Sequence, residues 1–205
     1  MKSLGIIPKV LLSLSLCLIL ISWPIIFLTS NDISWVPIQK RNNIPLTEGE
    51  IKMYDKEIIS FFKNDYSSLS FLTQEEFSHM QDVRTLLMKL DISFLISLWL
   101  ALVSVFYLRK LNFIKHLLKK VSIIVLIFLA FLFAMSLFSF NSFFSGFHEM
   151  FFVSNFSFQE DSMLKILYPD SFFRDIFILY FILAILGCLA TIAVSYKLKG
   201  LKNRR

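Results

Sequence analysis

Four long runs of apolar residues dominate the pattern of the chain. They cover roughly residues 6–29, 92–108, 121–143 and 176–196. Each run is close to the ~20 apolar residues that a helix needs to cross the hydrocarbon core of a bilayer. Because a membrane-spanning segment must satisfy its own backbone hydrogen bonds, we expect four transmembrane helices.

The first run resembles a signal peptide in position, and the second is less apolar than the others. The first continues through Trp23 and Pro24 with no small-x-small cleavage site, so we expect a retained anchor and not a signal peptide. The second is the shortest and contains Ser93, Ser97 and Ser104. A helix can place such hydroxyls on its own i−4 carbonyls or on a neighbouring helix, so this run still predicts a span.

Composition supports this reading. Hydrophobic residues make up 56% of the 205 residues and the mean hydropathy is +0.68, above the apolar share of soluble domains. The two cysteines, Cys17 and Cys188, both fall within predicted spans. We therefore expect them to pack as small apolar residues and not to form an external disulfide framework.

Charge predicts the orientation of the chain. The N-terminal residues, the 109–120 loop and the C-terminal tail carry 12 Lys and Arg and no Asp or Glu. All 15 acidic residues lie in the two other segments, 30–91 and 144–175. By the positive-inside rule, both termini are cytoplasmic and the two acidic segments face outward. The net charge of +6 then reports membrane topology and contact with anionic lipid, not nucleic-acid binding.

The outer segment 30–91 is too long for a plain connector. Its beginning is turn-rich, and Pro37 and Pro45 favour an extended chain, with Trp35 at the headgroup level. Thr47 and Glu50 have the spacing of a capping box, and the apolar residues that follow recur at helical spacing. This predicts an amphipathic helix near 48–63.

The rest of this segment leads into the second span. Residues 66–72 are short enough for a strand or a turn. Thr73 and Glu76 repeat the capping-box spacing, and apolar residues follow on one side of the predicted helix. We expect this helix to run with little break into the second span. The predicted fold is therefore an all-α membrane protein with an extracellular cap that has room for short strands.

The outer segment 144–175 and the end of the run before it are rich in phenylalanine. A belt of aromatic rings at the membrane surface is one explanation, and composition alone favours it. The lining of a pocket for a lipid-bearing ligand is the other. The residues are Phe140, Phe143, Phe144, Phe147, Phe151, Phe152, Phe156 and Phe158.

Histidine is the candidate for proton-transfer chemistry. His79 and His148 lie one in each outer segment, just before the second span and just after the third, whereas His116 lies in the basic loop. Imidazole exchanges protons near neutral pH, and Asp82, three residues after His79, lies on the same helix face and can orient its ring. His148 is not followed by the second histidine of a zinc-protease motif. No serine lies in a Gly-x-Ser-x-Gly sequence, so a serine hydrolase has no support.

Two stretches around these histidines resemble a known family. Residues 76–84 contain His79, Asp82, Val83 and Arg84, which resemble the His-x-x-Asp-Val-basic signature of the bacterial lipoprotein intramolecular transacylases. Residues 147–152, which read Phe-His-Glu-Met-Phe-Phe, and the later stretch 167–173 resemble two further blocks of that family. One departure is Phe158, where the family usually has tryptophan; this keeps an aromatic ring but loses the indole donor.

The resemblance implies a function and a site. Members of this family move the sn-2 acyl chain of a diacylglyceryl-modified lipoprotein onto the α-amino group of its N-terminal cysteine, at the outer face of the bacterial cell membrane. Its implied substrate is the lipoprotein, among membrane lipids, and we expect no cofactor and no metal ion. His79 and His148 would be catalytic. The expected orienting or substrate-binding residues are Asp82, Arg84, Phe147, Phe151, Phe152, Phe158 and Arg174.

Two other functions remain open from the residues alone. One is a non-enzymatic membrane protein whose outer segments bind a partner, with the histidines and phenylalanines as packing. The other is a metal-dependent membrane hydrolase that uses both histidines and a carboxylate. A transporter is disfavoured, because the predicted spans hold almost no ionisable residues and show no repeat.

Overall fold

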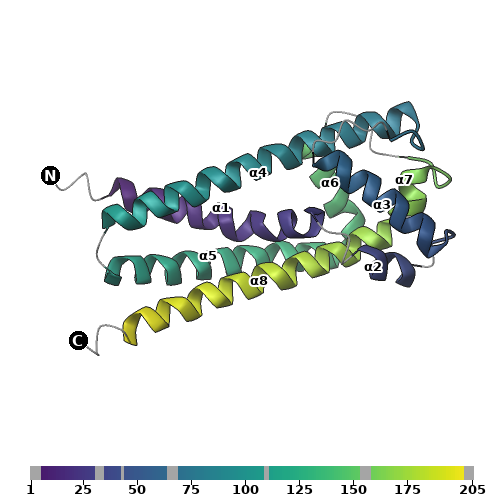
Figure 1. The fold of residues 1–205 in the computed structure, drawn as a ribbon. Coiled ribbons are helices and arrows are strands. Elements are labelled where there is room, and N and C mark those ends of the chain that lie inside the picture. The colour runs from purple at the N-terminus through teal and green to yellow at the C-terminus, as the bar shows by residue number, and fades with distance from the viewer. Residues whose placement is uncertain are drawn as a thin grey trace. The chain divides into compact units, whose positions relative to one another are not determined.

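The computed structural model describes residues 6–30, 35–42, 44–63, 69–108, 111–152 and 158–200. Within these ranges every regular element is a helix and no strand occurs. Four helices are long and apolar enough to cross a membrane: α1 Ile7–Ser30, α4 Gln74–Leu108, α5 Leu111–Phe138 and α8 Asp170–Gly200. Four are short: α2 Trp35–Arg41, α3 Glu48–Phe62, α6 Phe140–Phe151 and α7 Met163–Leu167 (Figure 1). The prediction of an all-α protein with four membrane helices is confirmed.

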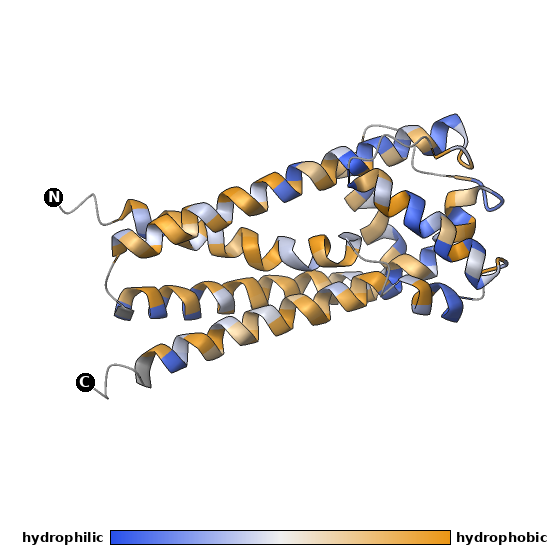
Figure 2. Cartoon of the chain, viewed as in Figure 1, coloured by the Kyte–Doolittle hydropathy of each residue, from blue (hydrophilic) through white to orange (hydrophobic). Residues whose placement is uncertain are grey.

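The chain divides into two compact units. One comprises residues 1–25, 91–134 and 181–205, and it holds the apolar parts of the four long helices. The other comprises residues 26–90 and 135–180, and it holds the four short helices and both outer histidines. Hydropathic colouring follows this division, because hydrophobic residues dominate the long helices and hydrophilic residues gather on α2, α3 and the start of α4 (Figure 2).

Hydroxyl groups inside the long helices are largely satisfied by their own backbone. Ser97 Oγ donates to the carbonyl of Ser93 at 2.7 Å, as the sequence predicts. Ser22 and Thr191 make the same i−4 bond to Leu18 and Gly187. Ser104 differs, since its Oγ is buried and has no hydrogen-bond partner in the described part of the chain.

The start of the first outer segment is not extended as expected. Residues 31–34 lie outside the described residues, but α2 begins at Trp35 and contains Pro37. A proline in the first helical turn loses no intrahelical bond, because the first N–H groups have no partner there. The headgroup position expected for Trp35 stays a prediction, but the residue packs inside the protein. Its side chain is 7% exposed, and its Nε1 donates to the carbonyl of Leu28 at 2.7 Å.

Both predicted capping boxes are present. Thr47 caps α3, with Glu50 returning a bond to the Thr47 backbone N–H. Thr73 and Glu76 do the same at the start of α4, which continues unbroken to Leu108. Of the predicted strand or turn at 66–72, residues 66–68 lie outside the described residues and 69–72 form a turn.

The second unit has its own hydrophobic core. Its buried members include Trp35, Ile58, Leu167 and Phe172, from four different helices. Buried polar side chains are hydrogen-bonded to one another in this unit. Asp55 Oδ1 accepts hydrogen bonds from Tyr168 Oη at 2.7 Å and from Gln39 Nε2 at 3.0 Å. Burial raises the pKa of the Tyr168 hydroxyl well above its usual value, and the neighbouring Asp55 adds to the shift.

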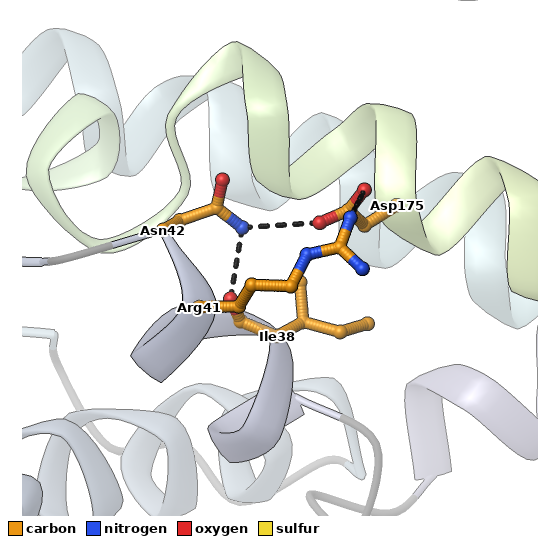
Figure 3. Close-up of polar contacts among 4 residues, drawn as sticks. All are labelled: Ile38, Arg41, Asn42 and Asp175. Carbon is orange, nitrogen blue, oxygen red and sulfur yellow. Dashed lines mark hydrogen bonds and ion pairs between the residues drawn. The ribbon is translucent and has the colours of Figure 1, made fainter.

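Helix α2 is tied to the beginning of α8 by polar bonds (Figure 3). Arg41 Nη2 lies 2.6 Å from Asp175 Oδ1, and Asn42 Nδ2 donates to Asp175 Oδ2 at 3.3 Å. The Arg41 side chain is 73% exposed, whereas that of Asp175 is 7% exposed. Both oxygens of the buried carboxylate are thus hydrogen-bonded, one by the last residue of α2 and one by the residue that follows it.

The helix expected to span 121–143 ends at Phe138. Ser139 has an extended backbone and caps a new helix, α6, by accepting a hydrogen bond from the backbone N–H of Ser142. The phenylalanines from Phe140 onward therefore belong to α6. This places His148 on a helix whose N-terminus is fixed at Ser139.

Candidate active site

The second unit brings the two outer histidines together. His79 lies in the second turn of α4, 13 residues before the apolar run that begins at Ile92, which is about 20 Å along a helix. His148 lies in the last turn of α6. Their ring centroids are 6.0 Å apart with an interplanar angle of 21°, and each side chain is 8% exposed. Residues 69 positions apart in sequence thus form one buried imidazole pair.

Phenylalanine rings surround this pair. Phe152 contacts both imidazoles, with ring centroids 5.0 Å from His79 and 5.3 Å from His148. Phe158 lies edge-on to His79 at 5.5 Å, and Phe147 lies 5.8 Å from His148. These three were expected from the sequence. Apolar rings on several sides lower the local polarity and restrict the access of water to both imidazoles.

Phe144, which was expected only as one of the phenylalanines of this segment and not as a site residue, contacts His148 directly. Its ring lies 4.1 Å from that of His148, and its carbonyl oxygen lies 2.9 Å from His148 Nδ1. A carbonyl only accepts, so Nδ1 carries the proton and Nε2 holds the lone pair. The i, i+4 spacing on a helix was the available signal, since such residues lie on one face.

Burial favours the neutral form of both imidazoles. The pKa of His79 is lowered to about 4, mainly by burial and in part by the neighbouring His148, while Asp82 partly opposes the shift. Burial also lowers the pKa of His148, against which the hydrogen bond to Phe144 acts. At neutral pH each ring therefore offers one donor and one acceptor nitrogen. His79 Nδ1 is buried without a hydrogen-bond partner in the described ranges.

The remaining predicted residues lie at varying distances from the pair. Asp82 acts on His79 electrostatically, as expected from its position three residues along α4. The ring of Phe151 lies 4.8 Å from that of Phe147, tilted by 44°, and Phe151 is 47% exposed. Arg84 lies over the ring of Phe61 at 4.8 Å, and so packs against α3.

Arg174, on the first turns of α8, is exposed. Among the described residues, His, Cys, Asp and Glu form no group of three placed to hold a metal ion. A groove of about 410 Å³ adjoins the α5–α6 junction, lined by Met135, Phe138, Ser139, Ser142 and Phe143.

Three solved structures of one membrane protein have the same fold as this chain. The lipoprotein intramolecular transacylase Lit from Bacillus cereus matches with a TM-score of 0.89 at 18% identity, over 100% of both chains. A histidine-to-arginine variant of that protein matches with a TM-score of 0.82 at 18% identity, over 99% of this chain and 95% of that one. A histidine-to-alanine variant matches with a TM-score of 0.83 at 17% identity, over 100% and 97%.

Comparison at the level of sequence identifies the family of this chain. No curated protein sequence matches the chain. The family model described as lipoprotein intramolecular transacylase Lit matches residues 4–173, which is most of the chain and includes both outer histidines. The chain therefore belongs to the lipoprotein intramolecular transacylase family, and the prediction of a membrane-integral acyltransferase is confirmed.

Proposed function

We propose that the enzyme moves the sn-2 acyl chain of a diacylglyceryl-modified lipoprotein onto the α-amino group of the lipoprotein's N-terminal cysteine, with His79 and His148 as the catalytic pair. The observation that carries the proposal is the buried pair of neutral imidazoles, 6.0 Å apart and lined by phenylalanines. The substrate brings both the ester and the amine, so no enzyme nucleophile is needed.

The reaction balances within one substrate molecule. A nitrogen–carbon bond forms between the amine and the acyl carbonyl, the ester carbon–oxygen bond breaks, and one proton passes from nitrogen to the glycerol oxygen. A free α-amino group has a pKa of about 8, so part of it is already neutral near pH 7. Binding amine and ester in reactive geometry can lower the barrier by roughly 7–11 kcal/mol.

The hydrogen bonds support different roles for the two histidines. The bond from His148 Nδ1 to Phe144 leaves Nε2 as an acceptor, suited to take the proton from the attacking amine. His148 then returns this proton to the departing sn-2 oxygen. His79, neutral at pH 7 because of its low pKa, suits donation from its ring N–H to the oxyanion of the tetrahedral intermediate.

The surrounding phenylalanines suit a lipid-bearing substrate and the exclusion of water. Water competes with the amine for the ester, and hydrolysis would release a fatty acid instead of transferring it. Phe147, Phe152 and Phe158 cover the imidazoles on several sides. We place the site at the outer face of the cell membrane, on the charge asymmetry of the chain.

Substitution of each histidine tests this proposal. In cells that accumulate diacylglyceryl lipoproteins, mass spectrometry of N-terminal lipopeptides should show the N-acyl, monoacylglyceryl product with the wild-type chain. His79→Ala and His148→Ala should lower its formation at least about 100-fold, the usual contribution of an acid–base group. His116→Ala is the matched control, because His116 is exposed on α5 and should retain wild-type activity. Near wild-type product from either site variant would refute the histidine pair.

A further inference from the structure

Glu76 is a buried carboxylate that the proposed reaction does not use. It is 1% exposed and lies on α4 three residues before His79, on the same helix face. Burial of a carboxylate is costly unless its oxygens are hydrogen-bonded. Both oxygens of Glu76 are bonded, and they are bonded to two different segments.

One oxygen belongs to the capping box. Glu76 Oε2 accepts from the backbone N–H of Thr73 at 2.8 Å, which fixes the first turn of α4. The other leaves α4 altogether, since Oε1 accepts from the backbone N–H of Leu164 at 2.9 Å. Leu164 stands in the first turn of α7, where backbone N–H groups have no partner within the helix.

The bond between Glu76 and Leu164 fixes the N-terminal end of α7, which is the end nearer to Phe158 in the sequence. The opposite end is held independently, because Leu167 is fully buried and its carbonyl accepts from Gln39 Nε2 at 3.4 Å. Phe158 lies six residues before Leu164, and its ring packs edge-on against His79. One carboxylate thus ties together the helix that carries His79 and the segment that covers it.

We propose that Glu76 is a positioning residue: by joining α4 to the start of α7, it holds the segment bearing Phe158 against the ring of His79. The proposal rests on the role proposed above for His79 but concerns a different contact. Without the Glu76 bond, Phe158 leaves His79 and water reaches the imidazole. Transfer then slows, although His79, His148 and the helices that carry them are unchanged.

Glu50 provides a matched control. It occupies the same position in the capping box of α3, where its carboxylate bonds to Thr47 and its side chain is exposed. Glu76→Gln loses one of its two bonds, since each carboxylate oxygen of Glu76 accepts from a different N–H group and an amide has one accepting oxygen. Glu50→Gln removes the same charge at the same capping position but keeps an accepting oxygen, because only Oε2 of Glu50 bonds to Thr47. Only Glu76→Gln also disturbs a bond to α7. Thr73→Ala removes the capping hydroxyl and leaves the bond between Glu76 and Leu164.

The test measures His79 directly, apart from activity. Full-length protein in bilayer nanodiscs is treated with diethyl pyrocarbonate, which modifies neutral imidazole, and mass spectrometry gives the rate at each histidine. His116, which is exposed, supplies the reference rate. We expect Glu76→Gln to raise the His79 rate at least fivefold at pH 7. The pH of half-maximal rate should rise from about 4 towards 6.5, as water replaces Phe158. His148 on α6 and Asp82 on α4, the titratable groups acting on His79, are unaltered in these variants.

Turnover of a synthetic diacylglyceryl lipopeptide completes the test. We expect kcat to fall at least tenfold in Glu76→Gln with a smaller change in KM, and to stay within twofold of wild type in Glu50→Gln and Thr73→Ala. An unchanged His79 rate in Glu76→Gln would overturn the positioning role, whatever the result for the histidine variants. Equal losses in Glu76→Gln and Thr73→Ala would also overturn it, because capping alone would then explain the effect.

Discussion

Burial has a larger effect on the two site histidines than any neighbouring charge. His79 and His148 are each 8% exposed, and burial is the main cause of the lowered pKa of each. Asp82 opposes this shift at His79 without reversing it. A carboxylate in hydrogen-bond contact would have favoured imidazolium, as in a catalytic triad. The pair is instead neutral near pH 7, which suits a reaction that moves one proton within one substrate.

The low pKa of His79 predicts how stability depends on pH. In the unfolded chain His79 has a pKa of about 6.5, and in the folded chain it has a pKa of about 4. Between these values the unfolded state binds the extra proton, so the free energy of unfolding falls as pH drops from about 6.5 to about 4. Thermal unfolding in detergent should show this loss in the wild type. His79→Gln, which has no such proton to bind, should show a smaller loss across the same window.

A control separates this effect from general acid destabilisation. Glu50 has a pKa that is lowered in the folded chain by its bonds to Thr47, so it also contributes to acid instability, at lower pH. A His116→Gln variant should follow the wild-type curve, since His116 is exposed. Equal slopes for wild type and His79→Gln between pH 6.5 and 4 would contradict the buried neutral state of His79.

Helix boundaries could be predicted from the sequence where the residues that set a boundary lie close together in the chain. The capping boxes at Thr47 and Thr73 predicted the starts of α3 and α4, because side chain and backbone bond within four residues. The four apolar runs predicted the long helices, because the length and hydropathy of a run are also local properties of the sequence. Helix α2 was missed, since Pro37 disfavours a helix except in its first turn. The end of α5 was missed because apolar residues continue on both sides of Ser139.

The candidate site was predictable in its residue types but not in its contacts. Two histidines in separate outer segments pointed to one site, and the resemblance to a family sharpened this. The bond between Glu76 and Leu164 joins residues 88 positions apart, and no local pattern reports such a pairing. For the same reason the sequence did not show that Arg84 packs on Phe61 of α3. Long-range packing decides these contacts, and periodicity describes only one helix at a time.

A close contact between α1 and α8 gives a prediction at the scale of elements. A Cβ added at Gly187 would lie 2.7 Å from Trp23 Nε1 and 3.2 Å from Trp23 Cε2. Membrane helices often pack closely through such small residues. Gly187→Ala should therefore lower the free energy of unfolding by about 1–3 kcal/mol, the usual cost of overpacking. Unfolding in mixed micelles, followed by circular dichroism, measures the change.

The matched control for this substitution is Gly146, which lies inside α6 and has no atom within 4 Å of an added Cβ. Alanine is the better helix former by roughly 0.5–1 kcal/mol, so Gly146→Ala should leave stability unchanged or raise it. If Gly187→Ala also proved neutral or stabilising, the close approach of α8 to Trp23 would not constrain the fold.

For the molecule as a whole, the division into two units separates most of the apolar helix length from the candidate site. The unit made of residues 1–25, 91–134 and 181–205 holds most of the apolar helix length and the third histidine. The unit made of residues 26–90 and 135–180 holds the histidine pair, the Asp55 contacts and Glu76. The buried carboxylates of Asp55 and Glu76 in the second unit accept hydrogen bonds from other segments, whereas a lipid-exposed helix segment has no such partners for a buried charge.

The charge distribution predicts which segments of the chain face each side of the membrane. The three basic segments carry 12 Lys and Arg and no acidic residue, whereas all 15 Asp and Glu lie in the segments 30–91 and 144–175. In a background with Cys17→Ala and Cys188→Ala, cysteines are introduced by Glu75→Cys and Lys120→Cys, both at exposed positions. In intact cells a membrane-impermeant maleimide should modify the first and spare the second. After permeabilisation both should react, which shows that position 120 is reachable when the reagent enters. Modification of position 120 in intact cells would reverse the predicted orientation and would place the histidine pair away from outward-facing lipoproteins.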